Sequence, residues 1–176
     1  MSSAKSHYGA FLDALGFNGD EELQGTPERV AEFYREFAPK SEPPHIEFLE
    51  TETSEPIVLK DLPFHSLCAH HLVPFFGTAA IAILPDKKIA GFGCIVRCLQ
   101  HFARQPQLQE RLGNQVADHL LSALQAKSVL VELNSRQMCM EMRGVRSSGK
   151  VRTLHRTHSE DILDGEHLIL EKLIYG

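Results

Sequence analysis

The sequence predicts an α+β domain in which helices cover one face of an antiparallel sheet. Helical and strand patterns follow in the order helices, hairpin, helix, hairpin, helix. This order favours helices gathered on one side of antiparallel strands. A chain of 176 residues is also long enough to build one substantial hydrophobic core.

Residues 1–45 are expected to form a helical segment, followed by one structural unit over residues 46–176. "SHYGAFLDALG" ends at a glycine, a common end of a helix, and "TPERVAEFYREFA" opens with Thr-Pro, an N-cap followed by a helix-compatible proline. The Pro-, Ser- and Glu-rich stretch 39–56 reads as an irregular connector.

The second unit carries the strand patterns. "GTAAIAILPDKKIAGFG" (77–93) predicts two strands joined by a Pro-Asp-Lys-Lys turn as a hairpin. Residues 106–125 repeat leucine and valine at helical spacing and predict an amphipathic helix. "SVLVELNS" alternates as a strand into "RQMCMEM", "KVRTLHRT" (150–157) supplies another strand, and the tail is expected to be helical.

A sheet of about four strands leaves two edges with unpaired backbone groups. Such edges are satisfied when they join the edges of neighbouring copies. A homo-oligomer is therefore expected on physical grounds alone.

Composition restricts the partners and the compartment. The net charge of −5 argues against nucleic acid and anionic membranes as partners. No apolar run approaches the roughly 20 residues that cross a bilayer, and the N-terminus does not resemble a secretory signal. The four cysteines (68, 94, 98 and 139) show no disulfide framework. A soluble protein of the reducing cytoplasm is expected.

Cys68 and His71 form a C-x2-H pattern, which allows one tight turn to present two ligands to a zinc ion. Cys139 is the candidate for a third, distant ligand, expected on a strand next to a turn. Three protein ligands leave an open position, as in catalytic zinc sites. The alternative is a buried cysteine beside surface histidines. Cys94 and Cys98 are interpreted as small apolar residues on a buried helix face.

Taken together, several segments resemble the GTP cyclohydrolase I family. They are "TPERVAEFY" (26–34), "SLCAHHLVPFFG" (66–77), "FARQPQLQERL" (102–112) and "MCMEMRGV" (138–145), in the family's order and approximate spacing. The resemblance covers residues 8 to 157. It implies the tunnelling fold, in which antiparallel sheets join into a barrel-like ring, typically a decamer of two pentameric rings.

The resemblance also implies roles for individual residues. It implies zinc as the cofactor and GTP as the substrate, with ring hydrolysis giving dihydroneopterin triphosphate and formate. Cys68, His71 and Cys139 match the zinc ligands, and His70 matches a proton-handling histidine. The remaining matches are a guanine-reading pair and three arginines that hold the triphosphate: Gln109, Glu110, Arg29, Arg97 and Arg143. Singly, these five side chains would be read as solvated surface groups.

The chain departs from the family at three places. Ala69 replaces a glutamate, Gln137 replaces a catalytic histidine, and Gly93-Cys94 replaces a Ser-Lys pair. Glutamine can position a substrate atom but does not titrate near neutrality. Glu141 either compensates for these losses or is a solvent-facing strand residue.

These departures leave three hypotheses for the function. The first is GTP cyclohydrolase activity, complete or stopping at a ring-opened stage. The second is a related hydrolase acting on another purine or pterin. The third is a catalytically weak subunit that binds a ligand or a partner.

Overall fold

The computed structural model describes residues 2–17, 19–38, 42–160, 162 and 165–175. The chain packs into two compact units, Met1–Ala38 and Pro39–Gly176. The division expected between residues 45 and 46 falls a short way inside the second unit. Among the described residues, no helix combines the length and the apolar character that crossing a bilayer requires.

The first unit contains α1 (Ser2–Ala14), the short 3-10 helix η1 (Glu21–Leu23) and α2 (Thr26–Glu36). Both predicted helices are confirmed. Gly16, with φ of +82°, follows the end of α1 and adopts a conformation that glycine reaches without strain. Gly25 is the N-cap of α2, so Thr26 is the first helical residue and not the cap.

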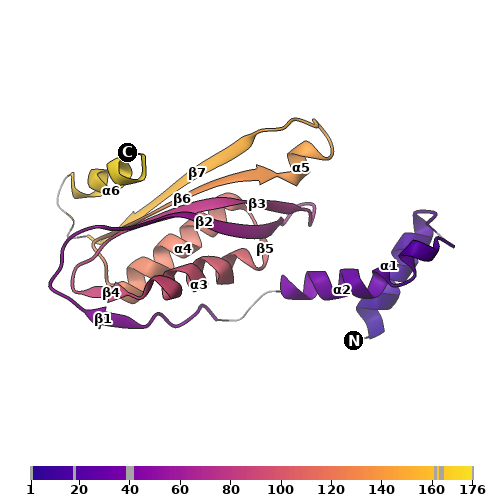
Figure 1. The fold of residues 1–176 in the computed structure, drawn as a ribbon, viewed down its shortest axis with the longest axis horizontal. Helices are drawn as coiled ribbons and strands as arrows, with labels where there is room; N and C mark the ends of the chain where they lie inside the picture. Colours follow the sequence, from indigo (N-terminus) through magenta and orange to yellow (C-terminus); the bar gives the residue numbers. More distant parts are fainter. Residues whose placement is uncertain (1, 18, 39–41, 161, 163–164, 176) are drawn as a thin grey trace. The chain divides into compact units, whose positions relative to one another are not determined.

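The second unit is built on a five-stranded sheet with the order β5-β2-β3-β6-β7 (Figure 1). Its strands are β2 (Ile57–Cys68), β3 (Pro74–Leu84), β5 (Pro106–Gln107), β6 (Ser128–Gln137) and β7 (Lys150–His158). All neighbours are antiparallel except β5, which runs parallel to the end of β2.

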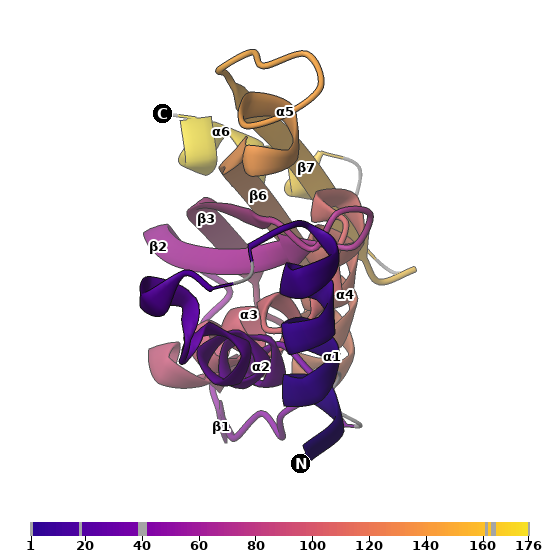
Figure 2. The same ribbon diagram turned by 90° about the vertical axis from the view of Figure 1, so that its right-hand side faces the viewer.

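Helices α3 (Phe92–Ala103) and α4 (Gln109–Leu124) lie side by side on one face of this sheet (Figures 1 and 2). Between them and the strands lies the main core, with fully buried Ile95, Leu99 and Leu120. Helix α6 (Glu166–Tyr175) lies on the opposite face, where Leu170 packs with Leu130 in a second, smaller core. The α+β class is confirmed, with α6 as an addition to the face expected to be open.

Three local expectations were wrong. Residues 77–93 do not form a hairpin, because β4 (Lys88–Ala90) pairs with β1 (Phe48–Glu50) in a separate two-stranded sheet. The stretch 39–56 is therefore not entirely a connector, since it contains β1. The strand expected over 136–142 ends at Gln137, and the one-turn helix α5 (Met138–Glu141) follows it.

Candidate metal centre and its surroundings

The turn between β2 and β3 brings His71 back toward Cys68. The Cys68 carbonyl accepts hydrogen bonds from the His71 and Leu72 amides, at 3.3 and 2.8 Å, while the Cys68 amide donates to Val73 O at 2.8 Å. Leu72 adopts a left-handed conformation with φ of +53°, which reverses the chain within a few residues. Cys68 is thus buried at a strand end, and His71 is exposed on the turn above it.

Cys139 follows the end of β6, which lies at the same end of the sheet as the turn that carries Cys68 and His71. Phe75 of β3 pairs with both Ser66 of β2 and Gln137 of β6, so the ends of these strands are aligned. The single turn of α5, closed by a hydrogen bond of 2.9 Å from the Met142 amide to Met138 O, then carries Cys139 inward. A helical turn and not a strand therefore positions this residue.

Cys68, His71 and Cys139 form a candidate metal centre. One ligand atom from each lies within 4.8 Å of the other two. Cys68 Sγ is 3.9 Å from His71 Nδ1, and Arg143 Nη1 donates a hydrogen bond of 2.6 Å to His71 Nε2. Two thiols and an imidazole are donors that suit zinc, and three ligands leave a coordination position open.

Burial and two neighbouring side chains change the pKa of the Cys139 thiol. Burial raises the pKa of Cys139 above its ordinary value, and the neighbouring Cys68 raises it further. Arg143 acts in the opposite direction. A cation beside the two thiols favours their ionised forms, which are the forms that bind metals.

Next to the centre lies a network of polar side chains, in which Gln109 and Ser135 are buried and Gln137 is half-buried. Gln109 is 4% exposed, and its Nε2 donates to the backbone oxygens of Leu133 and Val151, both at 3.0 Å. Its Oε1 accepts hydrogen bonds from Ser135 Oγ at 2.6 Å and from Gln137 Nε2 at 2.7 Å. Sequence reasoning missed Ser135, because a serine in an alternating strand gives no indication of its distant partner.

His70 lies next to His71 of the centre, and Glu110 lies in the first turn of α4. His70 is exposed next to His71, with their ring centres 6.2 Å apart and nearly perpendicular. Glu110 is exposed in the first turn of α4, directly after Gln109. The backbone joins this helix start to the centre, since the Ala69 amide donates to Gln107 O at 2.9 Å.

The remaining arginines lie in different surroundings. Arg97 of α3 donates a hydrogen bond of 3.0 Å to the buried Cys94 sulfur, one turn earlier in the helix. Arg29 belongs to the first unit, where it donates to Thr26 Oγ1 at 3.0 Å. Cys94 and Cys98 are both buried, as predicted, and burial raises the pKa of Cys98 to about 12.

Glu141 is paired rather than free in solvent. Its carboxylate accepts two hydrogen bonds from Arg136, one of them at 3.1 Å, and this pairing lowers the pKa of Glu141. It lies on α5 and not on a strand, so the expectation of a strand residue was wrong. The pairing of Glu141 with Arg136 links α5 to the end of β6.

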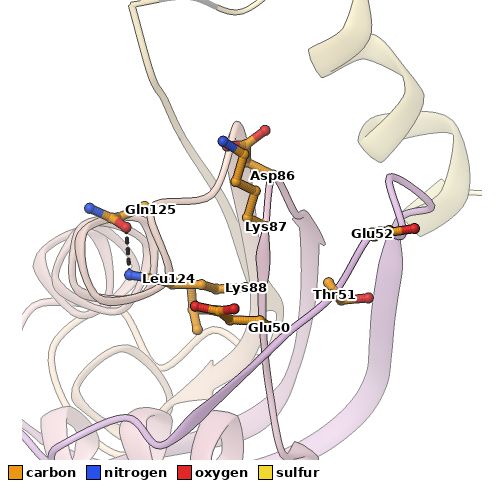
Figure 3. A pocket seen from close by; sticks show the side chains of 8 residues that line it. All are labelled: Glu50, Thr51, Glu52, Asp86, Lys87, Lys88, Leu124 and Gln125. Carbon is orange, nitrogen blue, oxygen red and sulfur yellow. Dashed lines mark hydrogen bonds between the residues drawn. The ribbon is translucent and has the colours of Figure 1, made fainter.

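A separate cavity of about 980 Å³ lies at the other end of β3 from the centre (Figure 3). Residues 50–52, 86–88 and 124–125 line it. Its charged side chains have both signs, and the Lys88 ammonium is already bonded to Gln125 Oε1 at 2.5 Å. None of the expected site residues lines this cavity.

Comparison of the sequence with known proteins shows the family to which it belongs. A family model described as GTP cyclohydrolase I matches residues 4–162. GTP cyclohydrolase 1 of Carboxydothermus hydrogenoformans is 46% identical over 144 residues, which make up 78% of this chain and 75% of that protein. That of Aquifex aeolicus is 45% identical over 141 residues, 79% of this chain and 77% of that protein.

Among solved structures, the archaeosine synthase QueF-Like in its apo form aligns with a TM-score of 0.45 and 12% identity, over 59% of this chain and 95% of that one. The family model spans most of the sequence, and both sequence relatives exceed 40% identity over most of both chains. The chain belongs to the GTP cyclohydrolase I family.

Proposed function

We propose that this protein is a hydrolase that opens the imidazole ring of a guanine nucleotide, with GTP as the substrate and zinc as the cofactor. The observation that carries the proposal is the convergence of Cys68, His71 and Cys139 from two distant segments, in a member of this family. A purely structural protein has little need of three such ligands beside an exposed histidine.

The donor set supports zinc in a catalytic role. The ion would be held by Cys68, His71 and Cys139, and three protein ligands are the number that leaves a position open for chemistry. When bound, zinc at such a site supplies activation of a water molecule for attack on an electrophilic carbon, here C8 of the base. The hydrolysis of the ring then requires protons to be delivered and removed by nearby side chains.

His70 is proposed to move these protons. It is exposed beside His71, and imidazole is the side chain best suited to accept and donate protons near neutral pH. Gln137 is proposed to hold an atom of the reacting base, because its amide lies near Cys139 and carries no titratable proton.

Glu110 is proposed to recognise guanine. A carboxylate can accept two hydrogen bonds from the N1–H and the exocyclic amine of guanine, whereas adenine offers no such pair of donors. Gln109 supports this recognition by anchoring the first turn of α4 to the carbonyl groups of β6 and β7. The proposed selectivity therefore rests on a rigid helix start.

Arg143, Arg97 and Arg29 are proposed to hold the triphosphate. Guanidinium groups remain charged and donate forked hydrogen bonds that fit phosphate oxygens. Arg143 is the best supported of them, since its contact with His71 places it directly at the centre. A homo-oligomeric ring, most simply a decamer with the site at a subunit boundary, and a cytoplasmic location are part of the same proposal.

The extent of the reaction depends on Gln137. Because its amide offers no proton near neutral pH, ring opening is expected to proceed while formation of dihydroneopterin triphosphate is slow or absent. The test incubates zinc-loaded protein with GTP and follows formate release and pterin fluorescence separately. Gln137→His should raise pterin formation, with Ser128→Ala as a control at the far end of β6. Full turnover by the unmodified protein, equal to that of Gln137→His, would falsify the partial reaction, and absence of any ring opening would contradict the proposed function.

A further inference from the structure

The orientation of the Gln109 amide is fixed by its surroundings. Its nitrogen lies 3.0 Å from two backbone carbonyl oxygens, those of Leu133 and Val151. Carbonyl oxygens only accept hydrogen bonds, so the NH2 group must face them. The Gln109 oxygen therefore points the other way, toward Ser135 and Gln137.

The orientation of the Gln109 amide also determines that of the Gln137 amide. The Gln109 oxygen accepts only, so the group that Gln137 turns toward it at 2.7 Å must be its amide nitrogen. The same nitrogen lies 3.0 Å from Ser135 Oγ, whose own hydrogen is donated to Gln109 Oε1 at 2.6 Å. Both hydrogens of the Gln137 amide are thus committed within the network.

Turning the Gln137 amide over is strongly disfavoured. Its oxygen would then face the Gln109 oxygen, and the two hydrogen bonds that its nitrogen donates would be lost. Gln137 itself is half-buried, but its partners Ser135 and Gln109 are 1% and 4% exposed, so their polar groups would lose these bonds without water to replace them. An unsatisfied polar group in such a position costs more than the bond itself contributes.

The Gln137 oxygen consequently faces the metal centre, where it lies 4.0 Å from Cys139 Sγ. We propose that Gln109 and Ser135 hold Gln137 as an obligate hydrogen-bond acceptor, so that the site prefers ligands with an N–H donor next to the metal-binding cysteines. Ser135 is a positioning residue in this arrangement, because it acts through Gln137. The ligand preference rests on the proposed function, whereas the amide orientation does not.

The preference for an N–H donor distinguishes intact guanine from its C8-oxygenated and ring-opened forms. In an intact guanine ring N7 has a lone pair and no hydrogen, so it would face another acceptor if the imidazole edge lies at the centre. A guanine that carries oxygen on C8 has a hydrogen on N7, and a ring-opened formamide also presents an N–H. The fixed amide thus favours the C8-oxygenated and opened forms over the intact base.

The direct test compares two nucleotides by calorimetry on the zinc-loaded protein. An 8-oxoguanine nucleoside triphosphate should bind about tenfold more tightly than GTP, the size of one well-placed hydrogen bond. Gln137→Met keeps the side-chain length without the acceptor and should reduce this ratio to near one. Ser135→Ala should reduce it in part. Ser128→Ala removes a buried hydroxyl that donates to Thr157 O on the same strand, and should leave the ratio unchanged.

A second measurement tests the orientation without any ligand. The side-chain NH2 of Gln137 should exchange slowly with solvent in nuclear magnetic resonance spectra, and more rapidly in Ser135→Ala. Fast exchange in the unmodified protein, or a binding ratio that Gln137→Met leaves unchanged, would overturn the proposal. If neither nucleotide binds, the proposed function fails, and the exchange rates alone decide whether Gln137 is fixed.

Discussion

Gln109 and Ser135 are polar residues in a core, and their contribution depends on partners far away in the sequence. Gln109 bonds to backbone groups of β6 and β7, and Ser135 bonds to Gln109 across 26 positions. The sequence predicted Gln109 as a substrate contact only through the family resemblance. It could not predict the burial of Ser135, because strand alternation says which residues share a face and not what lies opposite them.

His155 should make the stability of the second unit depend on pH. Burial lowers its pKa, and the carboxylates of Glu110 and Asp118 only partly offset this effect. The unfolded chain therefore takes up a proton near pH of about 6.5, while the folded protein does so only at lower pH. The free energy of unfolding should be highest above this range and should fall as the pH drops below it.

The test of this pH dependence is urea unfolding at several pH values. His155→Gln should flatten the loss of stability between pH values of about 7 and 5. The comparison uses slopes, since the substitution itself also removes the Nδ1 bond of 2.8 Å to Asn114. An identical pH slope in both proteins would show that His155 is not the responsible group.

Glu110→Ala should remove guanine selectivity and leave metal binding in place. Its carboxylate is exposed at the start of α4, so the loss should come from missing hydrogen bonds to the base and not from unfolding. A loss of about 1.5–3 kcal/mol in GTP binding is expected for bonds to a charged acceptor. Calorimetry with GTP and ATP measures it, with Glu132→Ala on β6 as a charge-matched control. Equal binding of the two nucleotides by the unmodified protein would remove the assignment.

At the scale of elements, the candidate site lies where β2 and β6 end beside the start of β3. Helix α4 was predicted well, because a long amphipathic repeat is a local property of the sequence. The pairing of β4 with β1 was not, since strand pairing depends on segments far apart along the chain. The alternating pattern of 136–142 predicted a strand, but the residues after Gln137 close one helical turn instead.

Gly77 controls how closely β3 and β6 approach behind the metal centre. A Cβ atom at this position would lie 2.0 Å from Asn134 O and 2.7 Å from Ser135 Cα, both backbone atoms that cannot rotate away. Gly77→Ala should therefore lower the free energy of unfolding by about 3 kcal/mol, as overpacking does in cores. Gly91→Ala, with nothing within 4 Å of the new atom, is the matched control for denaturant unfolding. Equal stability of the two variants would contradict the close packing of these strands.

At the scale of the whole molecule, family membership and the antiparallel sheet under α3 and α4 agree with the tunnelling fold that the resemblance implied. In the described part of the second unit, β7 pairs with β6 and presents its other edge outward. Leu154 on this strand is 38% exposed, and Val145 before it is 78% exposed. Such an edge is well suited to a neighbouring copy.

A ring-built homo-oligomer, most simply a decamer, is therefore predicted in solution. Joining the edges of neighbouring sheets would pair the outer edge of β7 with another strand and cover the exposed apolar side chains near it. Light scattering coupled to size exclusion, at micromolar concentration, measures the mass directly. A monomeric mass near 19.7 kDa would rule out the ring.

The central claim, that Cys68, His71 and Cys139 form a zinc site, is tested most directly by the metal content of the purified protein. Elemental analysis should find one zinc per chain in the unmodified protein and almost none in Cys139→Ala, with circular dichroism unchanged. Cys94→Ala removes a different cysteine, one on α3 and outside the three-ligand cluster, and should keep its zinc. Full zinc content in Cys139→Ala, or loss of zinc from Cys94→Ala alone, would contradict the account.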